Sequence, residues 1–125
     1  HHAFARLIQN RERMMPDGSF RFGAQPDDIA EAQRGLAEAQ AFIQGGEHDL
    51  VVLDEILAAA AYDLLVQDDV MQTIFVWQKN RYCELAMSGH KVWDELVAQA
   101  DLVTEMRKVK HYYAKGVPAR VGIEF

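Results

Sequence analysis

Two neighbouring carboxylates, Asp54 and Glu55, follow directly after a run of four aliphatic residues, Leu50–Leu53. An aliphatic strand that ends in an aspartate is the Walker B pattern, in which the carboxylate holds Mg²⁺ directly or through water. The following glutamate can act on the same ion or on a water molecule. Alternatively, Asp54 caps the next helix and Glu55 complements the helix dipole. From these residues alone both interpretations stay open.

A hydroxyl and an imidazole follow a second apolar segment, where Ser88-Gly89-His90 comes after Tyr82–Met87. No G-x-S-x-G elbow surrounds Ser88, which argues against a hydrolase triad. The spacing of His90 and His111 matches no zinc-binding pattern, and the chain has one cysteine only. The serine, glycine and histidine therefore point to ligand binding rather than to nucleophilic or zinc chemistry.

A basic stretch lies near the carboxyl terminus of a chain whose net charge is −6. Its charged members, within nine residues, are Arg107, Lys108, Lys110, His111 and Lys115. Such cations suit a polyphosphate or another anion, and the neighbouring tyrosines could stack on a planar ligand. The alternative is a solvated basic loop.

The elements that must position these residues alternate between helix and strand. Helix-opening residues stand at Pro26-Asp27-Asp28, and Gly45-Gly46 ends that helical pattern. The full prediction is a helix over 26–45, a strand over 49–53, a helix from Glu55 to about Leu65, a helix after Asp68, a strand over 82–88, a helix over 91–100 and a third strand over 102–106. This order predicts an α/β fold with parallel strands, crossover helices and both sheet faces covered.

Ligands of parallel sheets lie at the carboxyl ends of the strands. We therefore expect three strand ends to converge at one edge, namely Asp54-Glu55, Ser88–His90 and Glu105–Arg107. That edge would hold two acids, a hydroxyl, an imidazole and a guanidinium.

The overall composition limits the class of protein. A length of 125 residues predicts one domain, and the net charge of −6 argues against binding to nucleic acid or to anionic membrane. The longest apolar run, Ile56–Tyr62, is far too short to span a bilayer. A single cysteine and no visible secretory signal favour a reducing compartment, the cytoplasm.

Taken together, these segments resemble the carboxyl-terminal two-thirds of the ATP:corrinoid adenosyltransferases of the BtuR/CobO type. The resemblance rests on DLVVLDEI…AYDLL, ELAMSGH and ADLVTEMRKVKHYYAKGVPARVGIEF, in that order, from about Pro26 to Phe125. The closing 26 residues are the most specific part, because the family ends in ADLVTEM, a lysine–histidine pair and a glycine–isoleucine–acid–aromatic sequence.

The resemblance implies a P-loop-NTPase-like layered sheet and an enzyme that transfers the 5′-deoxyadenosyl group of ATP to the cobalt of a reduced corrinoid. Triphosphate is released, in cobalamin biosynthesis or salvage, and no catalytic side chain is expected because cobalt(I) is the nucleophile. The implied ligands are ATP, Mg²⁺ and the corrinoid, and the expected partners are a second copy in a homodimer and a flavoprotein reductase. Asp54 and Glu55 become candidate Mg²⁺ ligands. The candidate nucleotide- or corrinoid-binding residues are Ser88, Gly89, His90, Arg107, Lys110 and His111.

Two features depart from the family pattern. The sequence has no G-x-x-x-x-G-K-[ST] loop, which supplies backbone N–H groups to phosphates. The family's T-G-R-like turn reads Ser88-Gly89-His90, so an imidazole replaces a permanently charged guanidinium. We expect residues 1–125 to form a single adenosyltransferase-like domain whose first strand and P-loop lie upstream of His1. The alternative is a non-catalytic corrinoid-binding or scaffold protein that descends from the family and self-associates to cover an open sheet edge.

Overall fold

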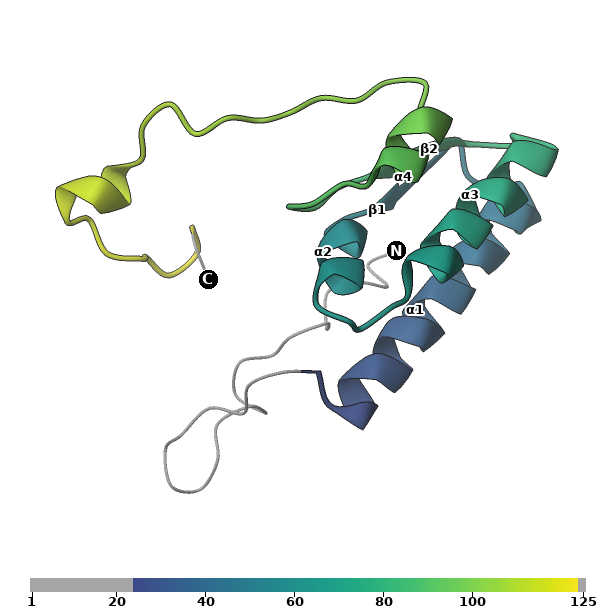
Figure 1. The fold of residues 1–125 in the computed structure, drawn as a ribbon, viewed down its shortest axis with the longest axis horizontal. Helices are drawn as coiled ribbons and strands as arrows, with labels where there is room; N and C mark the ends of the chain where they lie inside the picture. Colours follow the sequence, from purple (N-terminus) through teal and green to yellow (C-terminus); the bar gives the residue numbers. More distant parts are fainter. Residues whose placement is uncertain (1–23, 124–125) are drawn as a thin grey trace.

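A parallel two-stranded sheet, with helices packed against it, forms the body of the chain (Figure 1). The computed structural model describes residues 24–123, so predictions for the residues before and after this range lie outside it. The elements in chain order are α1 (Pro26–Gly45), β1 (Leu50–Leu53), α2 (Ile56–Ala61), α3 (Gln67–Asn80), β2 (Glu84–Met87), α4 (Asp94–Gln99) and the 3₁₀ helix η1 (Tyr112–Lys115).

Helix α1 begins and ends where the sequence predicts. Pro26 occupies its first position, where a missing N–H costs nothing, and the N–H of Gln25 donates to Asp28 Oδ2 at 3.1 Å. The helix stops at Gly46, whose φ of 67° lies in the left-handed region that glycine adopts freely. The cap is therefore a Gln25–Asp28 pair.

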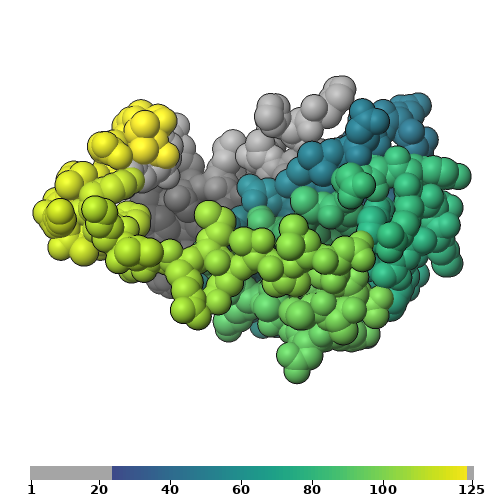
Figure 2. Space-filling view, turned by 90° about the horizontal axis from the view of Figure 1, so that it is seen from above, coloured from purple at the N-terminus to yellow at the C-terminus, as the bar shows by residue number. Residues whose placement is uncertain are grey.

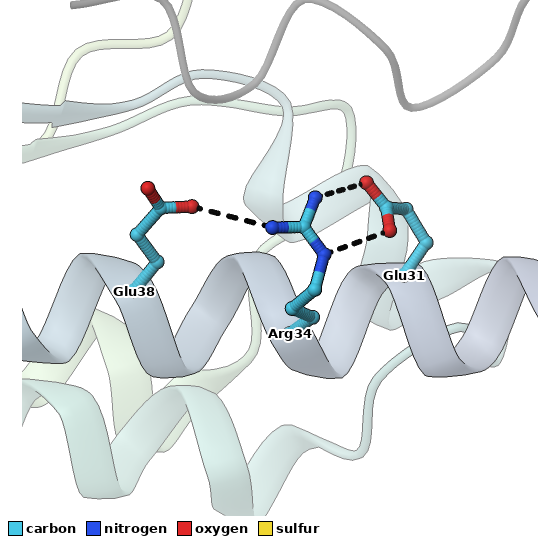
Figure 3. Close-up of polar contacts among 3 residues, drawn as sticks. All are labelled: Glu31, Arg34 and Glu38. Carbon is cyan, nitrogen blue, oxygen red and sulfur yellow. Dashed lines mark hydrogen bonds and ion pairs between the residues drawn. The ribbon is translucent and has the colours of Figure 1, made fainter.

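The outer face of α1 is charged and solvated. Arg34 Nε donates to Glu31 Oε2 at 2.9 Å, and Arg34 Nη1 lies 3.7 Å from Glu38 Oε2 (Figure 3). The hydrogen bond that Arg34 donates to Glu31, followed by the charge of the same carboxylate, raises the pKa of Arg34. Exposed ion pairs of this kind contribute little to the free energy of unfolding. We assign this face of α1 no functional role.

The inner faces of α1 and α3 lie side by side and form a large part of the core (Figure 1). Residues at helical spacing are buried on both helices, among them Leu36, Ala39 and Ile43 on α1 and Val70, Ile74 and Trp77 on α3. One polar contact crosses this interface, where Gln40 Nε2 donates to Thr73 Oγ1 at 2.8 Å. The helix predicted after Asp68 is thus confirmed as α3.

Strands β1 and β2 pair in parallel, with Leu50 opposite Glu84 and Leu53 opposite Met87. This confirms the predicted α/β class and strand direction. Val51 and Leu53 are buried, whereas Leu50 and Val52 are 56% and 54% exposed. Helix α1 contacts β1, and alternate side chains of the strand point away from the core. In the described part of the chain, the prediction that both faces of the sheet are covered is therefore wrong for β1.

Two predicted elements differ from the structure. The helix after Glu55 ends at Ala61, because Asp63 adopts a φ of 59° and turns the chain so that Leu64 and Leu65 reach the core from a loop. The third strand over 102–106 is absent from the described residues. An extended segment becomes a strand only when a neighbour takes up its backbone N–H and C=O groups, and β1 and β2 pair with one another instead.

The segment from residue 101 onward runs away from the helices and ends to one side of the body (Figures 1 and 2). Leu102 and Met106 are 84% and 94% exposed, so these two side chains pack against nothing in the part of the chain that the structure describes. Across residues 24–123, no helix has the length and apolar character needed to cross a lipid bilayer.

Candidate functional site

The acid pair lies in the turn between β1 and α2. Glu55 has a φ of 58°, which is uncommon for a residue other than glycine, asparagine or aspartate. Its carbonyl oxygen accepts the N–H groups of Ala58 and Ala59, at 3.0 and 3.1 Å, so α2 begins through a main-chain cap. The Asp54 carboxylate bonds to Ser88 and not to the helix, so the interpretation of Asp54 as a helix cap is wrong.

Ser88, at the end of β2, connects the two strand ends through four hydrogen bonds. Its N–H donates to Leu53 O at 3.2 Å, and its carbonyl oxygen accepts from the N–H of Leu57 at 3.1 Å. Its hydroxyl donates to Asp54 Oδ1 at 2.5 Å and accepts the N–H of Glu55 at 2.8 Å. The structure thus confirms that the carboxyl ends of the first two predicted strands meet.

Gly89 packs directly on the first turn of α2. A Cβ atom at this position would lie 2.6 Å from Leu57 Cβ and 2.8 Å from Ala58 N, closer than real Cβ contacts allow. The φ of Gly89, 154°, is one that residues with side chains rarely adopt. Close approach of the β2 end to α2 therefore requires glycine here.

The imidazole of His90 completes the group at this edge of the sheet. His90 Nε2 lies 3.8 Å from Glu55 Oε2, and both side chains are largely exposed. The edge therefore presents two carboxylates, a bonded hydroxyl and a solvated imidazole from the two segments that follow β1 and β2.

The predicted third contribution to this edge, from Glu105–Arg107, is absent. Arg107 Nε lies 3.3 Å from Glu105 Oε1 within the extended tail, and both side chains are exposed. Without a third strand in the described residues, nothing carries Arg107 to the carboxyl ends of β1 and β2. The prediction that three strand ends converge is therefore confirmed for the first two and wrong for Glu105–Arg107.

Lys110 and His111 also lie in the tail, in the segment that leads into η1, and this segment runs apart from β1 and α2 (Figure 1). His111 Nδ1 accepts the N–H of Tyr113 at 3.1 Å and caps η1, and its ring centroid lies 4.6 Å from that of Tyr112. A shallow hollow of about 280 Å³ is lined by Lys108, His111, Tyr113 and Ala114. The tail thus forms a second, basic and aromatic cluster.

The oxygen donors of the acid turn suit Mg²⁺, which is commonly bound through one or two carboxylates together with substrate phosphates and water. No group of three or more His, Cys, Asp or Glu side chains within residues 24–123 could hold a metal ion by itself. A metal at Asp54 and Glu55 would therefore depend on a ligand that brings further oxygen atoms.

Two features of this site were not predicted from the sequence. The left-handed conformation of Glu55 has no signal, because glutamate is not a residue type associated with positive φ. The link from Ser88 to Asp54 could have been found, since a hydroxyl that ends the strand next to an acid-ended strand lies at the same edge.

Comparison with known proteins adds a family match. The model of the family described as ATP:corrinoid adenosyltransferase BtuR/CobO/CobP matches residues 1–125. The chain is 32% identical over 98 residues to a corrinoid adenosyltransferase of Sinorhizobium sp., which covers 78% of this chain and 45% of that protein. It is 29% identical over 98 residues to the corrinoid adenosyltransferase of Escherichia coli K12, a match that covers 78% of this chain and 49% of that protein. It is 32% identical over 98 residues to the corrinoid adenosyltransferase of Pseudomonas aeruginosa, a match that covers 78% of this chain and 47% of that protein. The chain spans about half the length of the curated relatives it matches, and no solved structure matches it significantly.

Proposed function

The chain belongs to the family of ATP:corrinoid adenosyltransferases of the BtuR/CobO/CobP type, and on that premise we propose that it acts in the transfer of the 5′-deoxyadenosyl group of ATP to the cobalt of a reduced corrinoid. The observation that carries the proposal is the match of the family model to residues 1–125. The alternative of a non-catalytic corrinoid-binding or scaffold protein finds no support in these matches.

In the proposed reaction the electron pair of cobalt(I) attacks the 5′ carbon of ATP. A cobalt–carbon bond forms, the bond from C5′ to the triphosphate oxygen breaks, and triphosphate leaves with the bonding electrons. The protein then needs no nucleophile and no general base, and its tasks are to orient the two substrates and to stabilise the charge of the leaving triphosphate.

For this chain, we assign the acid turn to the metal–phosphate part of the site. Asp54 and Glu55 would hold Mg²⁺, which when bound neutralises charge on the triphosphate. Support comes from the exposure of the Glu55 carboxylate and from the position of both acids at the carboxyl end of a parallel strand. We extend the proposal to a P-loop-type fold for the whole protein.

The basic tail would supply a separate contact. The tail segment that carries Lys110 and His111 runs apart from β1 and α2 (Figure 1), so in this arrangement these two residues would meet a different part of the bound substrates. The charge of Lys110 suits an anionic group of ATP or of the corrinoid. Arg107 remains a candidate for the same role.

A spectrophotometric assay tests the function. Chemically reduced cobalamin, ATP and Mg²⁺ are mixed with the 125-residue chain and, separately, with the product of its complete gene, and formation of the adenosylated corrinoid is followed in the visible spectrum. We expect ATP-dependent product with the complete gene product, and omission of ATP as the control should abolish it. No product with either protein would refute the proposal.

A further inference from the structure

Ser88 stands out because all of its polar groups bond to the turn that carries the acid pair. Its backbone N–H and C=O bond to Leu53 O and Leu57 N, on either side of the acids. Its hydroxyl bonds to the side chain of Asp54 and to the main chain of Glu55. One residue, directly after β2, thereby bonds to both acids.

The hydroxyl of Ser88 has no proton left for a phosphate. A serine hydroxyl carries one donor hydrogen, and in this structure that hydrogen is given to Asp54 Oδ1. Its remaining capacity is one acceptor lone pair, because another accepts the N–H of Glu55. Phosphate oxygens are acceptors, so this arrangement disfavours Ser88 as a direct phosphate ligand.

The same bonds determine what the acids present to solvent. With Oδ1 of Asp54 engaged by Ser88, the Oδ2 atom has no hydrogen-bond partner among residues 24–123 and is the oxygen available to a cation. Glu55, in its left-handed conformation, donates its N–H to Ser88 Oγ, and its carboxylate lies 3.8 Å from His90 Nε2.

We propose that Ser88 is a positioning residue, whose hydroxyl orients the Asp54 carboxylate and holds the Glu55 main chain so that the pair takes up a divalent cation. This inference rests on the proposed function, because it takes the acid turn as the Mg²⁺ site. Partners of this kind, which bond to a ligating carboxylate, typically change metal affinity by about 10- to 100-fold when they are removed.

The test is titration of the full chain with Mn²⁺, with and without ATP, followed by water proton relaxation. Mn²⁺ replaces Mg²⁺ because both ions favour octahedral oxygen ligands. Ser88→Ala should weaken Mn²⁺ binding by about 10-fold or more, whereas Ser88→Thr, which keeps the hydroxyl, should stay within about threefold of the unmodified chain. Thr104→Ala, which removes an exposed hydroxyl from the tail, is the matched control and should leave binding unchanged.

A double-mutant cycle separates positioning from a general loss of structure. In an Asp54→Ala background, Ser88→Ala should cause a clearly smaller further loss of Mn²⁺ affinity, because the carboxylate that it orients is gone and only its bond to the Glu55 main chain remains. Equal losses in both backgrounds would overturn the inference, as would unchanged binding by Ser88→Ala. If the unmodified chain takes up no Mn²⁺ in either condition, the proposed metal site is refuted and the inference falls with it.

Discussion

Replacement of Gly89 by alanine tests how closely β2 approaches helix α2. The added Cβ would lie 2.6 Å from Leu57 Cβ and 2.8 Å from Ala58 N, and the second of these atoms is backbone that cannot rotate away. Overpacking of this kind costs about 1–3 kcal/mol, and an unfavourable backbone conformation costs about 1–3 kcal/mol more. Gly89→Ala should therefore lower the free energy of unfolding by about 2–6 kcal/mol.

Urea denaturation followed by circular dichroism measures this loss. With a denaturant dependence of about 1–3 kcal/mol per molar urea, a loss of about 3 kcal/mol lowers the midpoint by about 1–3 M. The matched control is Gly45→Ala, because no atom lies within 4 Å of a Cβ there and the residue is helical. It should be neutral or stabilising by up to about 1 kcal/mol. If Gly89→Ala unfolds at the same midpoint as the control, the close contact between β2 and α2 is wrong.

Three further perturbations test the assignments. Asp54→Asn and Glu55→Gln should each lower Mg²⁺-dependent turnover by about 100-fold or more with an unchanged circular dichroism spectrum, and full activity in both would remove the acid turn from the site. Lys110→Ala should weaken binding of triphosphate or corrinoid, measured by calorimetry, but change stability by no more than about 0.5 kcal/mol, whereas unfolding would make this exposed lysine structural. Burial, and to a smaller extent the charge of Glu84, raises the pKa of the Cys83 thiol. The folded pKa of this thiol therefore exceeds its unfolded pKa. Its contribution to the free energy of unfolding is fully present below the unfolded pKa and is lost as the pH rises through the folded pKa. Cys83 should react slowly with a disulfide reagent at a pH where the urea-unfolded chain reacts fast, and equal rates would contradict its burial.

The helices and the paired strands could be predicted because their signals are local. Proline and glycine mark the ends of α1, and the apolar runs before Asp54 and before Ser88 became β1 and β2. The meeting of Asp54 with Ser88 follows from the same information, since the carboxyl ends of parallel neighbours share an edge.

The remaining errors arise where structure depends on distant neighbours. A short segment such as 102–106 is compatible with a strand, but only a partner strand makes it one, and the sequence does not say which partner is in place. The interpretation of Asp54 as a helix cap was wrong for a related reason. Aspartate is suited both to capping a helix and to bonding a hydroxyl, and the proximity of Ser88 decides between them.

The most direct measurement on the central claim is calorimetric titration of ATP, with and without Mg²⁺, into the 125-residue chain, the product of its complete gene and their Asp54→Asn variants. We predict that Mg²⁺ strengthens ATP binding by the complete gene product and that the Asp54→Asn variant loses this enhancement. An enhancement that persists unchanged in the variant would contradict the assignment of the acid turn to the metal–nucleotide site.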